Sequence, residues 1–359
     1  MIKKLISIFL IISFTLLVSG CATVTGPSVS REEIERANEE LKVKALDFQI
    51  KQLQRLQTIE DRLILAIPKE DIKQEPRPLL GITCNPIDKY LEKLYNLSVK
   101  KGVVVIGVRE KSAARDISLQ PGDVLLSLNK TKIDNVRRFQ AVASKLKIDQ
   151  PLEIEILRGN QNLNFSTKMG QFPINIPIMM VDAQEVNAGT DGKMIVVTYG
   201  LVNFAKSDDE IAFVVGHELA HAVRGHVAKV QGGQILALIA ALALGIAVES
   251  RSPGSGSTVM RGVGDIGNIF TASYSRDLER EADYFGTKFV YYSGYDVNTC
   301  ATVEERFAIE IPATMIKNYL STHPSSPERV ARVRKIIEEL KAGNPTEPGI
   351  KQEEKAVVQ

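Results

Sequence analysis

His217-Glu218-Leu219-Ala220-His221 is the most informative stretch of this chain, because its two histidines are four residues apart. On an α-helix, side chains with that spacing lie one above the other on the same face. Two imidazoles arranged in this way can bind one metal ion from one side, as they do in zinc sites. The stretch therefore predicts a helical metal site and favours a hydrolytic enzyme.

The residues before this stretch predict where its helix begins. Ser207-Asp208-Asp209-Glu210 is typical of a capping box, in which Ser207 accepts a hydrogen bond from the N–H of Glu210 and the Glu210 carboxylate reaches back. One face of the helix is then apolar, at Ile211, Val214, Val215 and Leu219. We expect this packed helix to hold the histidines rigidly, as catalysis requires.

Two histidines leave one protein ligand to be found, because a catalytic zinc ion has three protein ligands and an open position. Glu279 is the candidate, since Ser275 to Asp283 is helical in pattern and Asp283 lies one turn beyond Glu279 on the same face. Asp283 could accept the free ring N–H of a ligating histidine and so orient it. Glu281 is the weaker ligand, because it lies about 160° around the helix from Glu279.

Glu218 follows a histidine ligand in the sequence but is not itself expected to bind the metal. We predict that it is the general base, which takes a proton from a metal-activated water whose pKa zinc lowers to roughly 7. One zinc ion per chain, bound by His217, His221 and Glu279, would thus provide a nucleophile at neutral pH.

The chain has two other histidines, whose roles the sequence defines less well. His226 lies nine residues after His217, on the opposite face of a continuous helix, so we expect it outside the site. His323 opens the run His323-Pro324-Ser325-Ser326-Pro327-Glu328-Arg329, just before the apolar positions of a final helix. Its position suits the start of that helix and a catalytic donor equally well.

Together these residues resemble the HtpX/BepA-type zinc endopeptidases, gluzincins related to the CAAX prenyl peptidases. The resemblance covers residues 175–340 and rests on segments in the family's order, namely Val186-Asn187-Ala188, Lys193 to Thr198, Ser207 to His221, Ser275 to Asp283, and His323 to Arg329. It implies that His217, His221 and Glu279 bind zinc, that Glu218 is the base and that Asp283 orients a ligand. It also implies that His323 and Arg329 lie near the developing oxyanion, which gives both a catalytic role.

A separate unit of short strands precedes this region. Its β-rich runs are Gly102 to Val108, Asp123 to Leu128 and Leu152 to Leu157, and Arg138 to Leu146 is typical of a short helix. This order resembles a PDZ domain of the HtrA protease type, with Leu79-Leu80-Gly81-Ile82 as its carboxylate loop. Lys130 departs from that pattern, because a turn glycine often follows the asparagine.

Such a domain would bind the extended C-terminal end of a protein by strand addition. The N–H groups of Leu80, Gly81 and Ile82 would surround the terminal carboxylate. An edge strand at Lys193 to Thr198 could then hold the scissile segment by the same kind of pairing. The alternative is a PDZ domain that only packs on the protease as a lid.

The first residues predict export and a lipid anchor. Lys3 and Lys4 precede an apolar stretch from Leu5 to Val18, which suits a secretory signal but is short for a membrane span. Val18-Ser19-Gly20-Cys21 resembles a bacterial lipobox, so Cys21 would become lipidated and anchor the protein stably in a membrane. Ala22 favours the outer membrane, facing the periplasm, by the same resemblance. The alternative is an ordinary signal peptide that contains a cysteine.

These patterns divide the chain into five segments. They are a lipoprotein signal peptide (1–20), a linker and helical stalk (21–75), a PDZ domain (76–170), a zinc metallopeptidase domain (171–342) and a disordered tail (343–359). The stalk's apolar stripe, Ile34, Ala37, Leu41, Ala45, Phe48, Leu53, Leu56 and Leu63, drifts from strict heptads, which favours a single helix. The fold class is α+β and multidomain: a mostly helical zincin protease domain with a small β-sheet follows a PDZ β-sandwich or barrel-like domain.

An apolar run from Ile235 to Val248 separates the two metal-binding segments. It is shorter than the ~20 residues that a membrane span needs, so we expect a buried or interfacial helix. The glycine- and serine-rich residues that follow, up to Gly267, would form either a flexible lid or an inert connector.

The charge balance excludes one class of partner. The chain has 45 basic and 43 acidic residues, and the resulting net charge of +2 is too small to attract nucleic acid. We therefore expect a lipid-anchored zinc endopeptidase of the bacterial envelope, whose substrates are misfolded or envelope proteins. The alternative is an assembly or chaperone-like factor that holds clients through the PDZ domain and stalk, with proteolysis latent or lost. The sequence leaves the oligomeric state open.

Overall fold

The computed structural model describes residues 26–174, 176–229, 274–311, 323 and 326–348. The signal peptide, Cys21, the apolar run 235–248, the loop after it and the end of the tail lie outside these residues. The chain divides into two compact units, residues 1–42 and 43–359. Among the described helices, none is both long and apolar enough to cross a lipid bilayer.

In the first unit, the described residues form the beginning of helix α2 (Arg31–Ala66). A capping box starts this helix: the N–H of Glu33 donates to Ser30 Oγ (3.2 Å), and the N–H of Ser30 donates to Glu33 Oε2 (2.8 Å). Ile34 and Leu41 are 58% and 64% exposed. The apolar stripe predicted for this part of the helix is therefore not buried.

In the second unit, the rest of α2 contributes to two hydrophobic cores. Leu46 and Ile50 pack with strand residues such as Val104 in one core. The stretch from Leu53 to Ile67 packs in the core of the C-terminal half. Phe48, predicted to lie on the stripe, is exposed instead.

A β-rich part begins and ends with two strands that pair with each other, β1 (Arg77–Leu79) and β8 (Gly170–Phe172). Its main sheet has the order β2-β3-β4-β6-β7, with β5 beside β4. The strands are β2 (Ile82–Pro86), β3 (Val103–Val108), β4 (Val124–Leu128), β5 (Thr131–Lys132), β6 (Pro151–Arg158) and β7 (Gln161–Lys168). The helices are the 3-10 turn η1 (Lys69–Asp71), which precedes β1, and α3 (Lys89–Tyr95), α4 (Ala113–Asp116) and α5 (Val136–Ala143). The predicted strands and helix are confirmed, with ends that differ by at most three residues.

The turn between β4 and β5 forms without glycine. Asn129 and Lys130 both have positive φ angles, 47° and 63°. A two-residue hairpin loop of this kind needs positive φ at both central positions. Lys130 therefore adopts the backbone conformation that glycine more often supplies.

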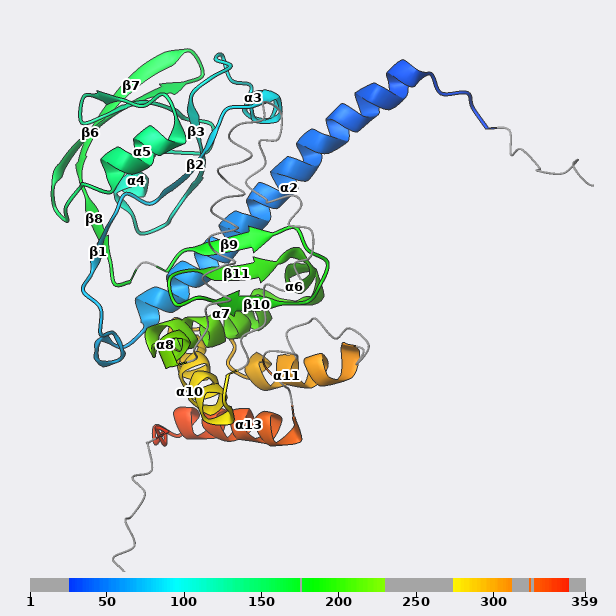
Figure 1. Cartoon of the computed structure of the whole chain (residues 1–359), viewed down its shortest axis with the longest axis vertical. Helices are drawn as coiled ribbons and strands as arrows, with labels where there is room; N and C mark the ends of the chain where they lie inside the picture. The colour runs from blue at the N-terminus through cyan, green and yellow to red at the C-terminus, as the bar shows by residue number, and fades with distance from the viewer. Residues whose placement is uncertain (1–25, 175, 230–273, 312–322, 324–325, 349–359) are drawn as a thin grey trace, which may run out of the picture. The chain divides into compact units, whose positions relative to one another are not determined.

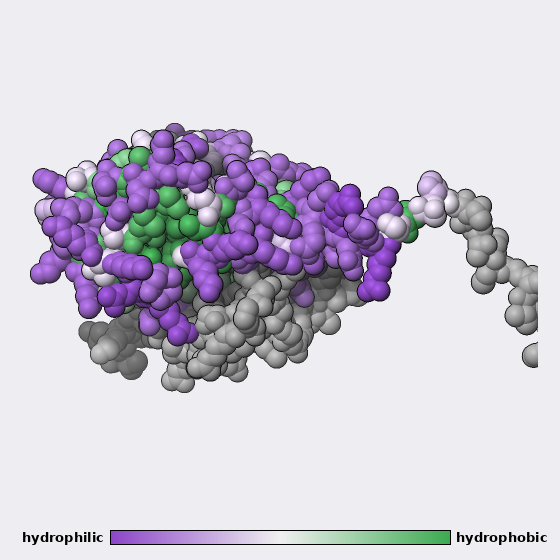
Figure 2. Space-filling view, turned by 90° about the horizontal axis from the view of Figure 1, so that it is seen from above, coloured by the Kyte–Doolittle hydropathy of each residue, from purple (hydrophilic) through white to green (hydrophobic). Residues whose placement is uncertain are grey.

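Figure 2 shows a face of the molecule on which hydrophilic side chains surround an apolar area.

The β-rich part contains a cavity of about 880 Å³ on its main sheet. Apolar residues that line this cavity include Leu125, Ile133, Ile154 and Phe165.

The C-terminal half consists of a small sheet and helices packed around α7 (Asp208–Val223). In Figure 1, α7 lies between the sheet on one side and α10, α11 and α13 on the other. The strands are β9 (Ile178–Val181), β10 (Ala188–Thr190) and β11 (Ile195–Thr198). The other helices are α6 (Tyr199–Phe204), α8 (His226–Lys229), α10 (Arg276–Ser293), α11 (Thr299–Glu310) and α13 (Pro327–Lys341). The predicted fold class, α+β with a mostly helical second half, is confirmed.

The small sheet has the strand order β10-β11-β9. β11 pairs antiparallel with β10 on one side and parallel with β9 on the other. The prediction that Lys193 to Thr198 forms an edge strand is therefore wrong, because β11 is central. Among the described strands, β10 and β9 are the edges of this sheet.

Helix α7 begins where the capping pattern predicts. Ser207 Oγ accepts a hydrogen bond from the N–H of Glu210 (3.3 Å). The Glu210 carboxylate reaches back to the N–H of Lys206 (2.8 Å), one residue before the expected partner. Every residue from Glu210 to Val223 is buried, so the helix is fixed on all sides.

Two glycines allow α7 and α10 to cross in close contact. A Cβ atom on Gly286 would lie 2.9 Å from the Cα of His217, which is closer than real Cβ atoms approach. A Cβ atom on Gly216 would lie 3.2 Å from the carbonyl oxygen of Gly286. This crossing brings Glu279, about two turns before Gly286, to the face of α7 that carries the histidines.

Candidate metal centre

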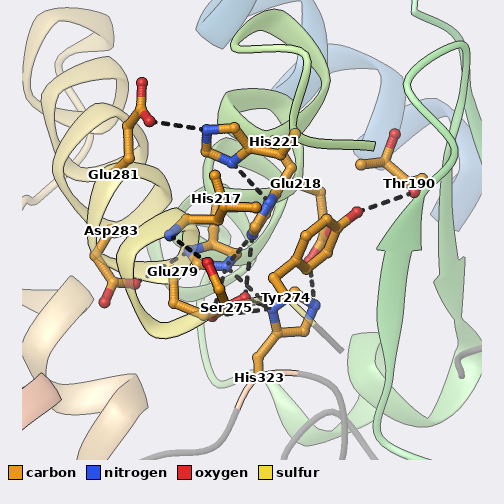
Figure 3. A network of polar contacts seen from close by, with 12 residues as sticks. Thr190, His217, Glu218, His221, Tyr274, Ser275, Glu279, Glu281, Asp283 and His323 are labelled. Carbon is orange, nitrogen blue, oxygen red and sulfur yellow. Dashed lines mark hydrogen bonds and ion pairs between the residues drawn. The ribbon is translucent and has the colours of Figure 1, made fainter. Parts of the chain in front are cut away.

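His217 and His221 lie on one face of α7, as their spacing predicts, with their Nε2 atoms 3.0 Å apart. Glu279 approaches from the start of α10 (Figure 3). Its Oε2 lies 3.4 Å from His217 Nε2, and its Oε1 lies 3.4 Å from His221 Nε2. All three side chains are buried.

These distances fit ligands around a single zinc ion. Tetrahedral ligands at about 2.0–2.1 Å from zinc are separated from one another by about 3.3 Å. The observed separations are 3.0–3.4 Å. Two imidazoles and one carboxylate are also a ligand set of catalytic zinc sites. The residues present therefore fit the ion that the sequence predicts.

Asp283 lies behind His217. His217 Nδ1 is 3.1 Å from Asp283 Oδ1, a contact that favours the ring proton on Nδ1 and leaves the Nε2 lone pair facing His221 and Glu279, where a metal would bind. Burial opposes ionisation of Asp283, but the charge of Arg329 and the hydrogen bond from His217 outweigh it and lower the pKa of the carboxyl. Asp283 is thus an anionic acceptor.

Arg329, the third residue of α13, holds this carboxylate. Its Nε lies 3.0 Å from both oxygens of Asp283, and its Nη2 lies 2.7 Å from Oδ1. Its Nη1 donates to the carbonyl oxygen of His323 (3.2 Å). The guanidinium is buried among protein groups behind the ligands.

His323 lies at the centre of the site. Its Nδ1 is 2.9 Å from Glu279 Oε1 and 3.2 Å from His217 Nε2, and its Nε2 is 3.2 Å from Glu218 Oε1. One ligand atom from each of His217, His221, Glu279 and His323 falls within 4.8 Å of the others. The structure thus brings His323 to both the candidate base and the candidate ligands.

Glu218 is fully buried beside the histidines (Figure 3). Burial raises the pKa of its carboxyl, although His323 and His217 oppose the shift. His323 Nε2 is near one oxygen but is not aligned for a hydrogen bond, and neither oxygen accepts one from the part of the chain described. A buried carboxylate with unused acceptors is suited to take up a proton from a molecule entering the site.

The sequence does not single out Tyr274, which also belongs to the site. Its ring stacks on His221, with centroids 3.8 Å apart and planes at 25°. Its hydroxyl donates to the carbonyl oxygen of Thr190 at the end of β10 (3.5 Å). This contact means that the β10 edge of the small sheet borders the metal centre.

His226 lies against the site, so its predicted place on the opposite helix face is wrong. Helix α7 ends at Val223, and Gly225, with a φ angle of 66°, turns the chain before His226 begins α8. His226 Nδ1 is 3.0 Å from His221 Nδ1. The sequence signal was Gly225, because glycine with positive φ commonly ends helices.

Glu281 points away from Glu279, as the helix geometry predicts. Its Oε1 accepts a hydrogen bond from Arg224 Nε (2.6 Å), and its Oε2 lies 3.1 Å from His226 Nε2. It therefore contacts His226 and not the three candidate ligands.

In the β-rich part, Leu80 and Gly81 connect β1 to β2, which begins at Ile82. Gly81 has a φ angle of 83°, and a Cβ atom there would lie 2.1 Å from Ser112 Cβ, so only glycine fits. Strand β2 pairs with β3 and is an edge of the described sheet. The loop thus leads into a strand that can receive an added peptide.

A pair of histidines on one helix, a carboxylate from a second helix and a buried glutamate define a metallopeptidase-type centre, and a PDZ-like sheet precedes it. Residues 156–337, just over half of the chain, match peptidase family M48, and residues 78–169 match the PDZ domain. The chain therefore belongs to peptidase family M48 and carries a PDZ domain.

Individual proteins resemble parts of the chain. The mitochondrial metalloendopeptidase OMA1 of Arabidopsis thaliana is 34% identical over 44% of this chain and 30% of its own length. The putative β-barrel assembly-enhancing protease of Vibrio cholerae is 31% identical over 43% of this chain and 33% of its own. A solved structure, the HtrA-type protease AlgW with decapeptide, is 28% identical over 28% of this chain and 30% of that one, with a TM-score of 0.26. The chain thus spans about a third of the length of each protein.

Proposed function

We propose that the protein is a zinc-dependent endopeptidase of the bacterial envelope that hydrolyses peptide bonds of misfolded or envelope proteins. The observation that carries this proposal is the convergence of His217, His221 and Glu279, with ligand atoms 3.0–3.4 Å apart, beside the buried Glu218. The names of two relatives, a metalloendopeptidase and a β-barrel assembly-enhancing protease, support the reaction and the compartment.

In this proposal, His217, His221 and Glu279 hold one zinc ion per chain. The bound ion would supply Lewis acidity, which polarises a carbonyl and acidifies water. Glu218 would take up the proton of the attacking water at a carboxylate oxygen and pass it to the leaving nitrogen. Its buried oxygens support this role, because neither accepts a hydrogen bond from the described part of the chain.

His323 and Arg329 would serve the reaction in different ways. His323 Nε2, 3.2 Å from Glu218 Oε1, would donate a hydrogen bond where negative charge develops on the substrate. The contacts of Arg329 favour a positioning role, since it binds Asp283 and the backbone of His323. Asp283 in turn would keep His217 in the tautomer that binds zinc.

Substrates would bind as extended chains at two edge strands. The Leu80-Gly81-Ile82 loop and β2 would receive a free C-terminus, and β10 would hold the scissile segment next to the metal centre. Two such sites would favour unfolded clients. The alternative, a PDZ domain that acts only as a lid, predicts equal effects of loop damage on all substrates.

The test of this function is metal analysis combined with hydrolysis of an unfolded protein. Purified protein should contain about one zinc ion per chain and should degrade casein. A chelator should stop the reaction, and added zinc should restore it. Zinc-loaded protein that leaves casein and other unfolded proteins intact would support the chaperone-like alternative instead.

The lipid anchor proposed for the envelope location depends on lipidation of Cys21. Mass spectrometry of the mature protein should find a lipidated Cys21 as the first residue, which would also show removal of residues 1–20. The Cys21→Ser variant should appear in the soluble fraction or as unprocessed precursor. A mature wild-type protein without lipid would contradict the anchor but not the peptidase.

A further inference from the structure

We propose that His226 and Glu281 form a hydrogen-bond relay that fixes the tautomer and orientation of His221 and thereby slows the loss of the metal ion. This inference rests on the zinc site of the proposed function. Neither residue is a ligand: each would act through His221, as a positioning residue.

The tautomers of the relay follow from what each ring nitrogen faces. His221 Nε2 faces His217 Nε2 at 3.0 Å and Glu279 Oε1 at 3.4 Å, so it must offer its lone pair to the metal. The proton of the neutral His221 ring is then on Nδ1, which lies 3.0 Å from His226 Nδ1. His226 Nδ1 must accept this proton's hydrogen bond, which assigns the His226 proton to Nε2.

Glu281 completes the chain of donors and acceptors. Its Oε2 lies 3.1 Å from His226 Nε2, an ion-pair contact that favours a proton on this nitrogen. Its Oε1 accepts from Arg224 Nε at 2.6 Å, and the guanidinium of Arg224 lies over the Phe285 ring at 4.1 Å. Both oxygens of Glu281 are thus fixed, and its position in turn determines the direction of the His226 ring.

The relay is sheltered and leaves His221 little freedom. His226 and His221 are fully buried, which excludes water from the Nδ1 to Nδ1 contact. Tyr274 stacks on the face of the His221 ring. The stacking limits tilting of the imidazole, and the contact with His226 limits its rotation within the ring plane. A hydrogen bond in such an environment is stronger than one exposed to solvent.

The two ligand histidines are thus supported by similar chains of residues. Asp283, held by Arg329, contacts His217 directly. The carboxylate that supports His221 is that of Glu281, which is held by Arg224. It does not contact His221 directly, because the His226 ring lies between the two side chains. Groups that orient metal ligands in this way commonly contribute about 10–100-fold to metal affinity.

The first test compares two substitutions of His226 in the full-length, zinc-loaded protein. His226→Leu removes the acceptor for His221 Nδ1–H, whereas the amide oxygen of His226→Asn can take the place of Nδ1. Transfer of zinc to an excess of a coloured chelator should be about 10–100-fold faster for the leucine variant. The asparagine variant should release zinc at a rate close to that of the wild type.

A double variant distinguishes a relay from separate structural effects. Because Glu281 acts through His226, adding Glu281→Leu to His226→Leu should not accelerate zinc release further, although Glu281→Leu alone should. The melting temperature of each metal-free variant provides the control for folding. Rates that multiply in the double variant would overturn the relay.

Nitrogen NMR of histidine-labelled protein gives a readout independent of activity. The chain has only four histidines, so their ring signals can be assigned by substitution. Zinc-loaded wild type should show His221 bound through Nε2 with a slowly exchanging proton on Nδ1, and that proton should exchange faster in His226→Leu. Equal zinc release and equal proton exchange in both proteins would overturn the proposal.

These outcomes are separable from those of the proposed function. Zinc-loaded wild type without peptidase activity would contradict the function but would leave the relay intact. A wild type that binds no zinc would overturn both.

Discussion

Gly286 of α10 lies directly against His217 of α7, where a Cβ atom would be 2.9 Å from the His217 Cα. Glu279 on α10 and the two histidines on α7 are therefore positioned by a backbone contact that leaves no room for a side chain. The geometry of the metal centre depends on this crossing as much as on the ligands themselves.

Gly286→Ala should displace α10 from α7 and weaken both the fold and the metal site. Overpacking of this kind typically destabilises a protein by about 1–3 kcal/mol. Zinc affinity should fall as well, because Glu279 moves with α10. Chemical denaturation and zinc titration measure the two effects, with Tyr292→Ala, at an exposed position of the same helix, as the control. Unchanged zinc affinity would show that the crossing does not position the ligand.

The two glutamates of α10 should respond differently to the same substitution. Glu279→Gln should lose the zinc ion, because it removes an anionic ligand. Glu281→Gln should still bind one zinc ion per chain, since its side chain contacts Arg224 and His226. Metal analysis after dialysis measures both variants. The opposite result, zinc retained in the first and absent from the second, would show that Glu281 is the ligand.

Glu218→Gln should keep the metal and lose the reaction. The amide cannot accept the proton, while the three candidate ligands are unchanged. Hydrolysis of casein should fall by at least the ~10²-fold that is typical of losing one acid-base group. The zinc content of the same sample is the control, and near-normal turnover would exclude Glu218 as the base.

The buried Glu60 of α2 predicts a pH dependence of stability. Burial raises the pKa of its carboxyl from 4.5 to about 8, against the opposing charge of Arg109, which lies 2.9 Å away. Between these values the folded protein retains a proton that the unfolded chain has released. The free energy of unfolding should therefore decrease as the pH rises through this window.

Glu60→Gln removes this titration and keeps the shape of the side chain. Relative to the wild type, the variant should be more stable at about pH 8.5 than at about pH 6, measured by urea denaturation. Glu40→Gln, at an exposed position of the same helix, should not change the pH profile. If Glu60→Gln changed the free energy of unfolding by the same amount at both pH values, the result would argue against the raised pKa of Glu60.

Damage to the carboxylate loop should affect long substrates more than short ones. Gly81→Val places a side chain where Ser112 already lies and should distort the N–H groups of the loop. The KM for an unstructured protein with a free C-terminus should rise, whereas cleavage of a short peptide with a blocked C-terminus should not change. An equal loss on both substrates would favour a PDZ domain that covers or supports the protease.

Local patterns in the sequence predict most of the site because the relevant residues are close together along single helices. His217 and His221 lie within one helix, and Glu279 and Asp283 lie within another. In each case the helical periodicity determines that the two side chains share a face. His226 was misplaced because the periodicity was extended past Gly225, where the helix ends. Tyr274 carries no local signal, since only tertiary packing brings its ring onto His221.

The apolar stripe of α2 shows the same limit. Spacing alone places Ile34, Leu41 and Phe48 on one apolar stripe but does not say whether that stripe is buried, and all three side chains are exposed. Burial begins at Leu46, where partners from other segments become available. Periodicity identifies which residues share a face but not where along a long helix that face meets a partner.

The burial of α2 in two cores has a consequence for how the second unit unfolds. Leu46 and Ile50 complete one core, and Leu56, Ile59 and Leu63 complete the other. Neither core can lose this helix without exposing apolar surface. Because α2 is continuous, its unfolding in one core would also disrupt the other core. Residues 43–359 should therefore melt in a single cooperative transition, with the sheet of the PDZ domain and the candidate metal centre lost at the same temperature.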